Sequence, residues 1–472
     1  MKKIKYSLIL ITVVILSFSC NDFLDTELKG EYTSEGFFTS EANATAAVTG
    51  VYNSLYDNKL WVFTDVASDD AVKGGNAGDQ ADINDIDNFS ATSDNGIIAT
   101  FWQDTYETIS QANNAITYIP AIDMDEELRD RLVGETKFFR AYSYFNLVNI
   151  FGKVPLKIEP QNTDATINVG LSEVSAIYAQ IKQDLTDAIA VLPDSYSSET
   201  GRATKGAALA LLAKVNLFQK NYTECLNNIQ TLENLSIYDL EPNYEDLFAA
   251  GAEKSNEIIF GLRFLVDDVV SLGNWLNVWF APSIEGGYYF NAPTQEYVDA
   301  FTEQTTGGED DPRLDASIGR DGKPWFNNTT FSATWSEATE YLVKKYNEDM
   351  VEGVAKAQST VPYHILRYAD VLLMKAEALN ESGSTSTAIA EVNKVRNRAK
   401  LASVTTATQA SLRTIIRNER RKELGFEFNR FFDLMRYGQS AATTALPDLP
   451  WNGEHFYFPI PQSEIDSNTA LQ

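Results

Sequence analysis

Aromatic and polar side chains lie together in two loop-rich parts of the chain. The first part, residues 60–96, contains Trp61, Asp69, Asp70 and Asn76. The second part, residues 238–362, holds most of the tryptophans, and its candidate ligand-binding residues are Trp275, Trp279, Tyr288, Tyr289, Trp325 and Trp335. A sugar ring has a flat face of C–H groups surrounded by hydroxyls, so an aromatic ring can cover the face while carboxylates and amides bind the hydroxyls. These residue types predict a carbohydrate-binding surface.

The same aromatic residues have a structural alternative. Aromatic rings in loop-rich regions often fill a small core, and Trp275 and Trp279 have the i, i+4 spacing of one buried helical stripe. An exposed face that the later rings share with Trp61 would favour ligand binding. Burial of all these rings would favour a purely structural role.

The chain offers little chemistry for catalysis or metal binding. It has only two histidines, His364 and His455, and Cys225 has no second thiol beside it with which to build a zinc site. We expect His364 to be a packing or capping residue at the start of a helix. The G-x-S-x-G pattern of a serine nucleophile and the glycine pattern of a phosphate-binding loop are both missing. We therefore predict a protein that is not an enzyme and uses no cofactor or metal.

Carboxylates provide the one catalytic alternative, a secreted glycoside hydrolase, because that chemistry needs only two acids at a set separation. The chain has 66 Asp and Glu residues, so the sequence singles out no pair. Asp82, Asp85 and Asp87 have a spacing at which calcium could bind, but the glycine and distal glutamate of an EF-hand loop are missing. We interpret these three residues as solvated acids of a loop.

The stretch 417–438, RNERRKELGFEFNRFFDLMRYG, is dense in charges and aromatic rings. It follows an apolar helical row, Leu412, Ile415 and Ile416, so some of its charges must face the packed side. Guanidinium groups buried there need carboxylates or carbonyls from elsewhere in the fold. The alternative is a polyanion site, but the acids in this stretch and a formal net charge of -28 would repel nucleic acid. We predict a structural hub and no nucleic-acid partner.

Hydrophobic periodicity predicts a mainly α fold built from pairs of helices. Helices are expected at 41–56, 102–116, 125–151 and 172–192, and helix–turn–helix units at 204–232 and 365–399. The facing sides of these units carry alanines, which let helices approach closely. Such pairs are similar to tetratricopeptide units, which stack because one pair cannot bury its apolar face alone. The segment 60–96 has no sustained period and is expected to be a long functional loop or a loose subregion.

The start of the chain predicts export and a lipid anchor. A lysine-rich beginning precedes an apolar run, residues 6–18, and Cys20 stands at the expected cleavage point. We predict a signal peptide at 1–19 and lipidation of Cys20, whose acyl chains would hold the protein on a membrane. An ordinary signal peptide followed by an incidental cysteine is the alternative.

Four blocks of sequence together resemble the SusD/RagB family, the surface glycan-binding lipoproteins of Bacteroidetes nutrient-uptake systems. They are the stretch 417–438, AYSYFNLVNIFGKVPL at 141–156, RYADVLLMKAEALNESG at 367–383 and FPIPQSEIDSN at 458–468. The resemblance implies a tetratricopeptide-like helical scaffold that forms one structural unit. Its expected regions are an N-terminal helical region at 20–237, a variable, loop-rich and partly β region at 238–362, and a C-terminal helical region at 363–472.

The resemblance also implies a lipid-anchored protein of the outer membrane that faces the cell surface. Such a protein binds an oligosaccharide and delivers it to a partner SusC-like TonB-dependent transporter, over which it sits as a lid. This work requires no catalysis. Some members of the family, of the RagB kind, handle peptides, so a peptide ligand is an alternative. A purely structural partner of the transporter is another.

Overall fold

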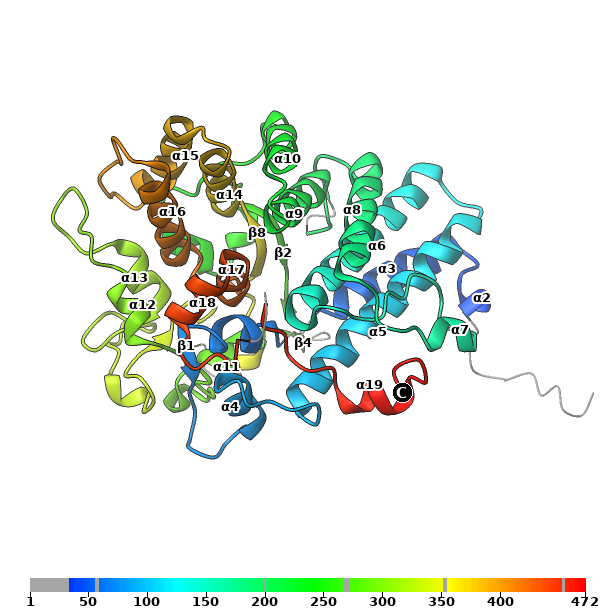
Figure 1. Cartoon of the computed structure of the whole chain (residues 1–472), viewed down its shortest axis with the longest axis horizontal. Helices are drawn as coiled ribbons and strands as arrows, with labels where there is room; N and C mark the ends of the chain where they lie inside the picture. Colours follow the sequence, from blue (N-terminus) through cyan, green and yellow to red (C-terminus); the bar gives the residue numbers. More distant parts are fainter. Residues whose placement is uncertain (1–33, 56–58, 199–200, 267–270, 351–354, 452–454) are drawn as a thin grey trace, which may run out of the picture.

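The computed structural model describes residues 34–55, 59–198, 201–266, 271–350, 355–451 and 455–472. Helices make up most of this part of the chain and form a row along one side of the molecule (Figure 1). The predicted signal peptide and Cys20 lie outside the described residues. Within the ranges above, no helix is both long and apolar enough to cross a bilayer.

The first group of helices packs around the long helix α6. Its members are α2 (Ser34–Phe37), α3 (Glu41–Asn53), α5 (Gly96–Tyr118), α6 (Glu126–Phe151), α7 (Asp164–Ile167) and α8 (Val174–Val191). The side chain of Asp125 caps α6 by accepting a hydrogen bond from the Leu128 N–H at 2.9 Å, and α6 packs against α5 and α8. The helix predicted at 125–151 is confirmed. The helix predicted at 172–192 is α8; Ser172 could have capped it, but Glu173 is the N-cap and the helix begins at Val174.

Two helix pairs continue the row, as the periodicity predicted. They are α9 (Lys205–Phe218) with α10 (Tyr222–Asn234), and α14 (Tyr368–Glu381) with α15 (Thr385–Arg398). The pairs contact each other through α10 and α14, and the alanines of α9 are fully buried. The C-terminal helices are α16 (Gln409–Leu424), α17 (Arg430–Tyr437), α18 (Gln439–Ala445) and α19 (Gln462–Ser467). The helical-pair scaffold is therefore confirmed.

The two loop-rich parts of the chain, residues 60–96 and 238–362, lie mostly on the opposite side of the molecule from the helix row (Figure 1). Their short helices are α4 (Ala81–Asp87), α11 (Leu276–Phe280), α12 (Gln295–Asp299) and α13 (Pro312–Ser317). The strands form antiparallel pairs: β1 (Ala71–Lys73) with β5 (Asn291–Pro293), β2 (Ile258–Leu262) with β8 (Tyr363–Arg367), β3 (Leu265–Val266) with β4 (Ser271–Leu272), and β6 (Ile318–Gly319) with β7 (Leu342–Val343).

Two expectations about local structure are wrong. His364 lies in strand β8 and not at a helix start, because pairing with β2 keeps this segment extended until Arg367. The histidine is buried, its Nε2 lies 2.5 Å from the Leu247 carbonyl, and burial lowers its pKa to about 4. The segment 60–96 is not one long loop, because residues 60–67 are buried, form a π-helical turn at Val62–Val66 and lead into β1 and α4.

Buried ion pairs join α16 and its C-terminal extension to the rest of the fold, as predicted for a structural hub. Arg367 lies at the centre, with one guanidinium nitrogen 2.6 Å from both Glu257 and Glu423 and another 2.6 Å from Glu427. All four side chains are at most 3% exposed. Burial alone would raise the pKa of Glu423, but nearby arginines, Arg398 first among them, hold it well below its usual range. We use the name ionic hub for Arg367, its three glutamates, and the buried side chains Arg313, Arg398, Glu419, Arg420, Asp370 and Asp433.

Candidate functional site: an aromatic platform

The pairing of β1 with β5 brings the two aromatic loop regions together. Lys73 stands opposite Asn291 in the register, and beyond the strands the backbone N–H of Gly74 donates to the Phe290 carbonyl at 3.0 Å. The Gly75 N–H donates to the Tyr289 carbonyl at the same distance. A Cβ on Gly74 would lie 2.0 Å from that Tyr289 oxygen, so the close approach of the two chains requires glycine. The site is thus built from segments that are far apart in sequence.

Three rings form what we call the aromatic platform: Trp279, Tyr288 and Phe290. The ring centroids of Trp279 and Tyr288 are 5.4 Å apart, those of Trp279 and Phe290 6.0 Å, and those of Tyr288 and Phe290 5.9 Å. The Phe290 N–H donates to the Trp279 carbonyl at 2.9 Å. This bond holds the segment that carries Tyr288 and Phe290 against α11. Tyr288 is 45% exposed, Trp279 is half-buried and Phe290 is buried. The platform therefore offers ring surface to solvent on a rigid base.

Polar side chains border the platform. The Lys59 ammonium lies 5.1 Å from the centroid of the Trp279 ring, and the Lys73 ammonium lies 5.6 Å from that of Phe290. Lys73 also donates to the Asn76 carbonyl at 2.8 Å. The exposed Asn76 side chain accepts a hydrogen bond from the Tyr289 hydroxyl at 2.9 Å. The Asn76 amide nitrogen also donates to Asp79 at 3.2 Å. Amide and ammonium groups of this kind can bind the hydroxyls of a ligand.

Tyr289 has a strained backbone at this border, with φ at +43° in a residue that is not glycine. Burial, together with the nearby Glu337 and Asp79, raises the pKa of its hydroxyl, so the hydroxyl stays protonated and donates to Asn76. Asp87 accepts the Lys73 N–H at 2.9 Å, and burial raises the pKa of this carboxyl to about 6. Both contacts fix the segment that carries Asn76.

The structure places Trp61 beneath the platform. Its side chain is fully buried, and its ring centroid lies 6.0 Å from that of Trp279 and 5.5 Å from that of Phe280. Trp61 thus supports Trp279 from below, and the later aromatics share no exposed face with it. This burial was not visible in the sequence, because residues 60–67 show no helical period.

Asp69 and Asp70 directly precede β1 and are bound by arginines of the stretch 417–438. Asp69 accepts hydrogen bonds from Nε and Nη2 of Arg430, each at 2.7 Å. Asp70 accepts a hydrogen bond from Nε of Arg421 at 2.5 Å. Asp70 is 1% exposed and Asp69 is 7% exposed at its side chain. Both carboxylates therefore bind arginines of the chain itself.

Two of the remaining candidate rings, Trp325 and Trp335, lie in a second aromatic cluster. The Trp325 centroid lies 5.2 Å from Phe331 and 6.3 Å from Trp335, and Tyr289 packs in the same cluster. Trp325 is 5% exposed and donates its Nε1–H to Glu285 at 2.8 Å, whereas Trp335 is half-buried. Trp275, at the N-cap of α11, is also half-buried.

Three residues of the candidate site were missed in the sequence: Lys59, Lys73 and Phe290. Phe290 completes the run Tyr288–Tyr289–Phe290 and could have been found from it, but nothing in the sequence places either lysine over a ring. Asp82, interpreted as a solvated acid, accepts the Gly96 N–H at 3.1 Å. Across the described ranges, no group of three or more His, Cys, Asp or Glu residues is arranged to hold a metal ion.

Comparison with known proteins identifies the family. The family model described as "SusD family" matches residues 256–472, and the model described as "Starch-binding associating with outer membrane" matches residues 22–217. Together these matches cover most of the chain. The protein belongs to the SusD family.

Individual relatives agree with this assignment. SusD-like protein P2 of Formosa agariphila is 28% identical over 99% of this chain and 98% of the relative. The solved structure of a laminarin-binding SusD-like protein is 30% identical, with a TM-score of 0.78 over 91% of this chain and 98% of that one. A SusD-like carbohydrate-binding protein from Bacteroides fragilis is 26% identical, with a TM-score of 0.80 over 92% of this chain and all of that one (100%).

Proposed function

We propose that this protein binds an oligosaccharide on the aromatic platform and does not catalyse its cleavage. The observation that carries the proposal is the exposed ring surface of Trp279 and Tyr288, bordered by Asn76, Lys59 and Lys73. A sugar ring would stack on these rings, and its hydroxyls would meet the amide and ammonium groups at the border. Relatives described as laminarin-binding and carbohydrate-binding support the same class of ligand.

The ten candidate residues take different parts in this proposal. Trp279, Tyr288 and Asn76 contact the ligand, and Tyr289 orients Asn76. Trp61 supports the platform, and the arginine-bound Asp69 and Asp70 hold its segment in place. Trp275 and Trp335, which are half-buried, extend the surface available to a longer glycan, and the buried Trp325 supports Trp335.

We further propose that the bound oligosaccharide is delivered to a SusC-like TonB-dependent transporter. A lipid on Cys20 would anchor the protein on the outer membrane, facing the cell surface, and the signal peptide at 1–19 would direct its export. The family description that mentions association with the outer membrane supports this location. A peptide ligand of the RagB kind is the alternative within the family.

Affinity electrophoresis tests the proposal directly. The soluble form, residues 21–472, is run in gels that contain a panel of polysaccharides, and the same samples are assayed for new reducing ends. We expect at least one polysaccharide to retard the protein and no reducing ends to appear. New reducing ends would indicate a glycoside hydrolase instead. Retardation by none of the panel would contradict polysaccharide binding and leave short oligosaccharides, a peptide ligand or a purely structural role.

A further inference from the structure

A buried contact between an acid and an amide lies beneath the aromatic platform. Asp65 belongs to the π-helical turn that directly follows Trp61. Asn291 begins strand β5, directly after Phe290. The Asn291 amide nitrogen donates to Oδ2 of Asp65 at 3.0 Å, and the two residues are 0% and 1% exposed. The contact therefore joins the turn that follows the supporting tryptophan to the strand that follows a platform ring.

The second oxygen of each side chain is left over. Oδ1 of Asp65 and Oδ1 of Asn291 are both buried, and neither has a hydrogen-bond partner among the described residues. Burying such an oxygen without a partner is costly, because its bonds to water are lost. A carboxylate oxygen and an amide oxygen are both acceptors, so they cannot satisfy each other. A carboxylic acid can satisfy the amide oxygen, because its O–H is a donor.

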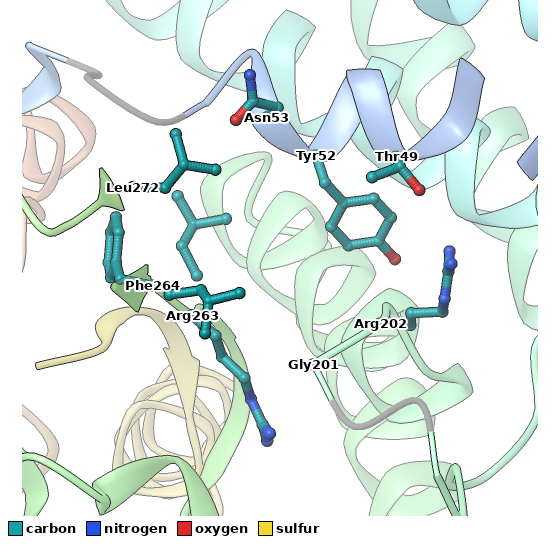
Figure 2. A pocket seen from close by; sticks show the side chains of 11 residues that line it. Thr49, Tyr52, Asn53, Gly201, Arg202, Arg263, Phe264 and Leu272 are labelled. Carbon is teal, nitrogen blue, oxygen red and sulfur yellow. The ribbon is translucent and has the colours of Figure 1, made fainter. Parts of the chain in front are cut away.

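The described hollows do not reach these two oxygens. The largest hollow, of about 440 Å³, lies between the end of α3 and the strands β2–β4 (Figure 2). Asp65 and Asn291 line neither this hollow nor the smaller ones of about 190, 170 and 20 Å³. None of these four hollows therefore supplies water to the unpaired oxygens.

The charged groups around Asp65 are engaged with partners of their own. Helices α4 and α17 and strands β1 and β5 pack against the turn that carries it. The ion pairs of this neighbourhood are Asp70 with Arg421, Lys345 with Glu427, Asp69 with Arg430, and Asp433 with Arg420 and Arg436. The acids of α4 are the half-buried Asp82, Asp85 and Asp87. Two buried tyrosines, Tyr346 and Tyr363, also feel the charge of Asp65, and burial raises the pKa of both hydroxyls. Among the described residues, Asp65 has no ion-pair partner.

Burial favours the neutral form of Asp65. It is the largest influence on the pKa of this carboxyl and raises it well above its usual range. The charge of Asp70 raises the pKa further. The Asn291 amide, the Lys345 ammonium and the Phe428 N–H act in the opposite direction, and the pKa remains raised against them.

We propose that Asp65 is a neutral carboxylic acid in the folded protein and forms a two-bond pair with the Asn291 amide. The O–H of the acid donates to the amide oxygen, while its carbonyl oxygen accepts from the amide N–H. This pair makes Asp65 a positioning residue for the platform, because it fixes the strand after Phe290 to the turn after Trp61. Ionisation would place a carboxylate oxygen against the amide oxygen and weaken the link. The positioning role rests on the proposed function, whereas the pair itself does not.

Asp65→Asn tests the protonation state. An asparagine has the shape of the neutral acid and offers the same donor and acceptor, but it cannot ionise. In the parent protein, the unfolded chain loses the Asp65 proton above its usual pKa of about 3.9 while the folded chain keeps it, so this residue lowers stability as the pH rises. We expect the unfolding constant of the parent, relative to that of Asp65→Asn, to rise about tenfold per pH unit, about 1.4 kcal/mol, for as long as the folded carboxyl stays protonated.

Urea denaturation of both proteins at each pH measures this ratio, and the contribution of His364 cancels in it. A ratio that does not grow with pH, or an Asp65→Asn variant that is less stable than the parent at neutral pH, would overturn the proposal. The control is Asp433→Asn, the same change at a buried carboxyl whose pKa Arg420 and Arg436 hold low against the effect of burial. It should be less stable than the parent at neutral pH, with a difference that shrinks in acid.

Exchanging the two side chains tests whether they bond to each other. Asn291→Asp places two carboxyls in contact, and we expect it to lower stability at neutral pH. Adding Asp65→Asn restores one acid and one amide with their positions exchanged, so the double variant should regain stability. A double variant that is no more stable than Asn291→Asp alone would contradict a direct pair.

Infrared difference spectroscopy detects the proton itself. The spectrum of the parent minus that of Asp65→Asn at neutral pH should contain the C=O stretch of a protonated carboxyl, and a missing band would overturn the proposal. The positioning role has its own readout, the pH dependence of polysaccharide retardation. Affinity should fall as Asp65 ionises in the parent and show no such fall in Asp65→Asn, and equal pH dependence in both would overturn that role. If no polysaccharide binds, the proposed function fails, and the stability and infrared results still decide whether the pair exists.

Discussion

The ionic hub and the aromatic platform are both dense clusters of side chains. The central arginine of the hub is fully paired within the chain, whereas the platform leaves ring and amide surface exposed to solvent. In the hub, Arg367 is 1% exposed and each of its donor groups meets a glutamate or a carbonyl of the same chain. In the platform, Tyr288 is 45% exposed, and the amide of Asn76 reaches solvent. The comparison shows that residue density alone does not mark a binding site. The proposed site lies where ring surface and polar groups remain exposed and available to a ligand.

Removing the central arginine of the hub should have the largest effect. Arg367→Met leaves Glu257, Glu423 and Glu427 buried without their shared counter-ion, and we expect a loss of about 3–5 kcal/mol in the free energy of unfolding. Urea denaturation followed by circular dichroism measures this loss. The control is Arg413→Met, which removes a half-exposed pair with Glu381 and should cost about 0–1 kcal/mol. Equal losses in the two variants would contradict a special role for the hub.

Removing the central ring of the platform should weaken ligand binding and leave the fold intact. For Trp279→Ala we expect the affinity for the retarding polysaccharide to fall about 30-fold, as for a stacked aromatic at the centre of an interface. Affinity electrophoresis at graded polysaccharide concentrations measures the change, and circular dichroism checks the fold. Trp335→Ala, in the second cluster, should change the affinity much less. A larger effect of Trp335→Ala would move the centre of the site to that cluster.

Lowering the pH should destabilise the core near the hub through the buried His364. The pKa of His364 is lowered to about 4 by burial, below its usual value of about 6.5 in an unfolded chain. The unfolded state therefore binds the extra proton first, and stability falls as pH drops from about 6.5 towards 4. Between pH 7 and pH 5 we expect this residue to account for a loss of about 2 kcal/mol. Urea denaturation at both values should show a smaller loss in His364→Gln, and an identical loss would exclude His364 as the cause.

The smallest expected effect concerns the polar border of the platform. Asn76→Ala removes the acceptor of the Tyr289 hydroxyl and an amide available to sugar hydroxyls, so we expect a loss of about 1 kcal/mol in binding, roughly a fivefold higher Kd. Gel retardation measures this change. Asn84→Ala, on the exposed side of α4, serves as the control and should bind as the parent protein does. An unchanged Kd in Asn76→Ala would restrict the site to ring stacking.

Several elements of the fold were predictable from local pattern. The helix at 125–151, the helix pairs and the buried Trp102 follow from apolar residues at helical spacing, which is a local signal. The structural role of the stretch 417–438 was predictable because buried guanidinium groups need carboxylates. Strand β8 was missed, since the apolar residues of 363–367 continue the period of the following helix. The division of the chain at 237/238 and 362/363 stays a prediction.

The sequence by itself determined the helical scaffold, the acidic charge, the two aromatic regions and, through four blocks of residues, the family. Only the tertiary structure decided which rings are exposed. Tyr289 and Asn76 are 213 positions apart, and they meet because β1 pairs with β5. The same packing buries Trp61 and commits Asp69 and Asp70 to arginines. Exposure depends on which distant segments cover a residue, and the residue's own neighbours in the sequence carry no record of that.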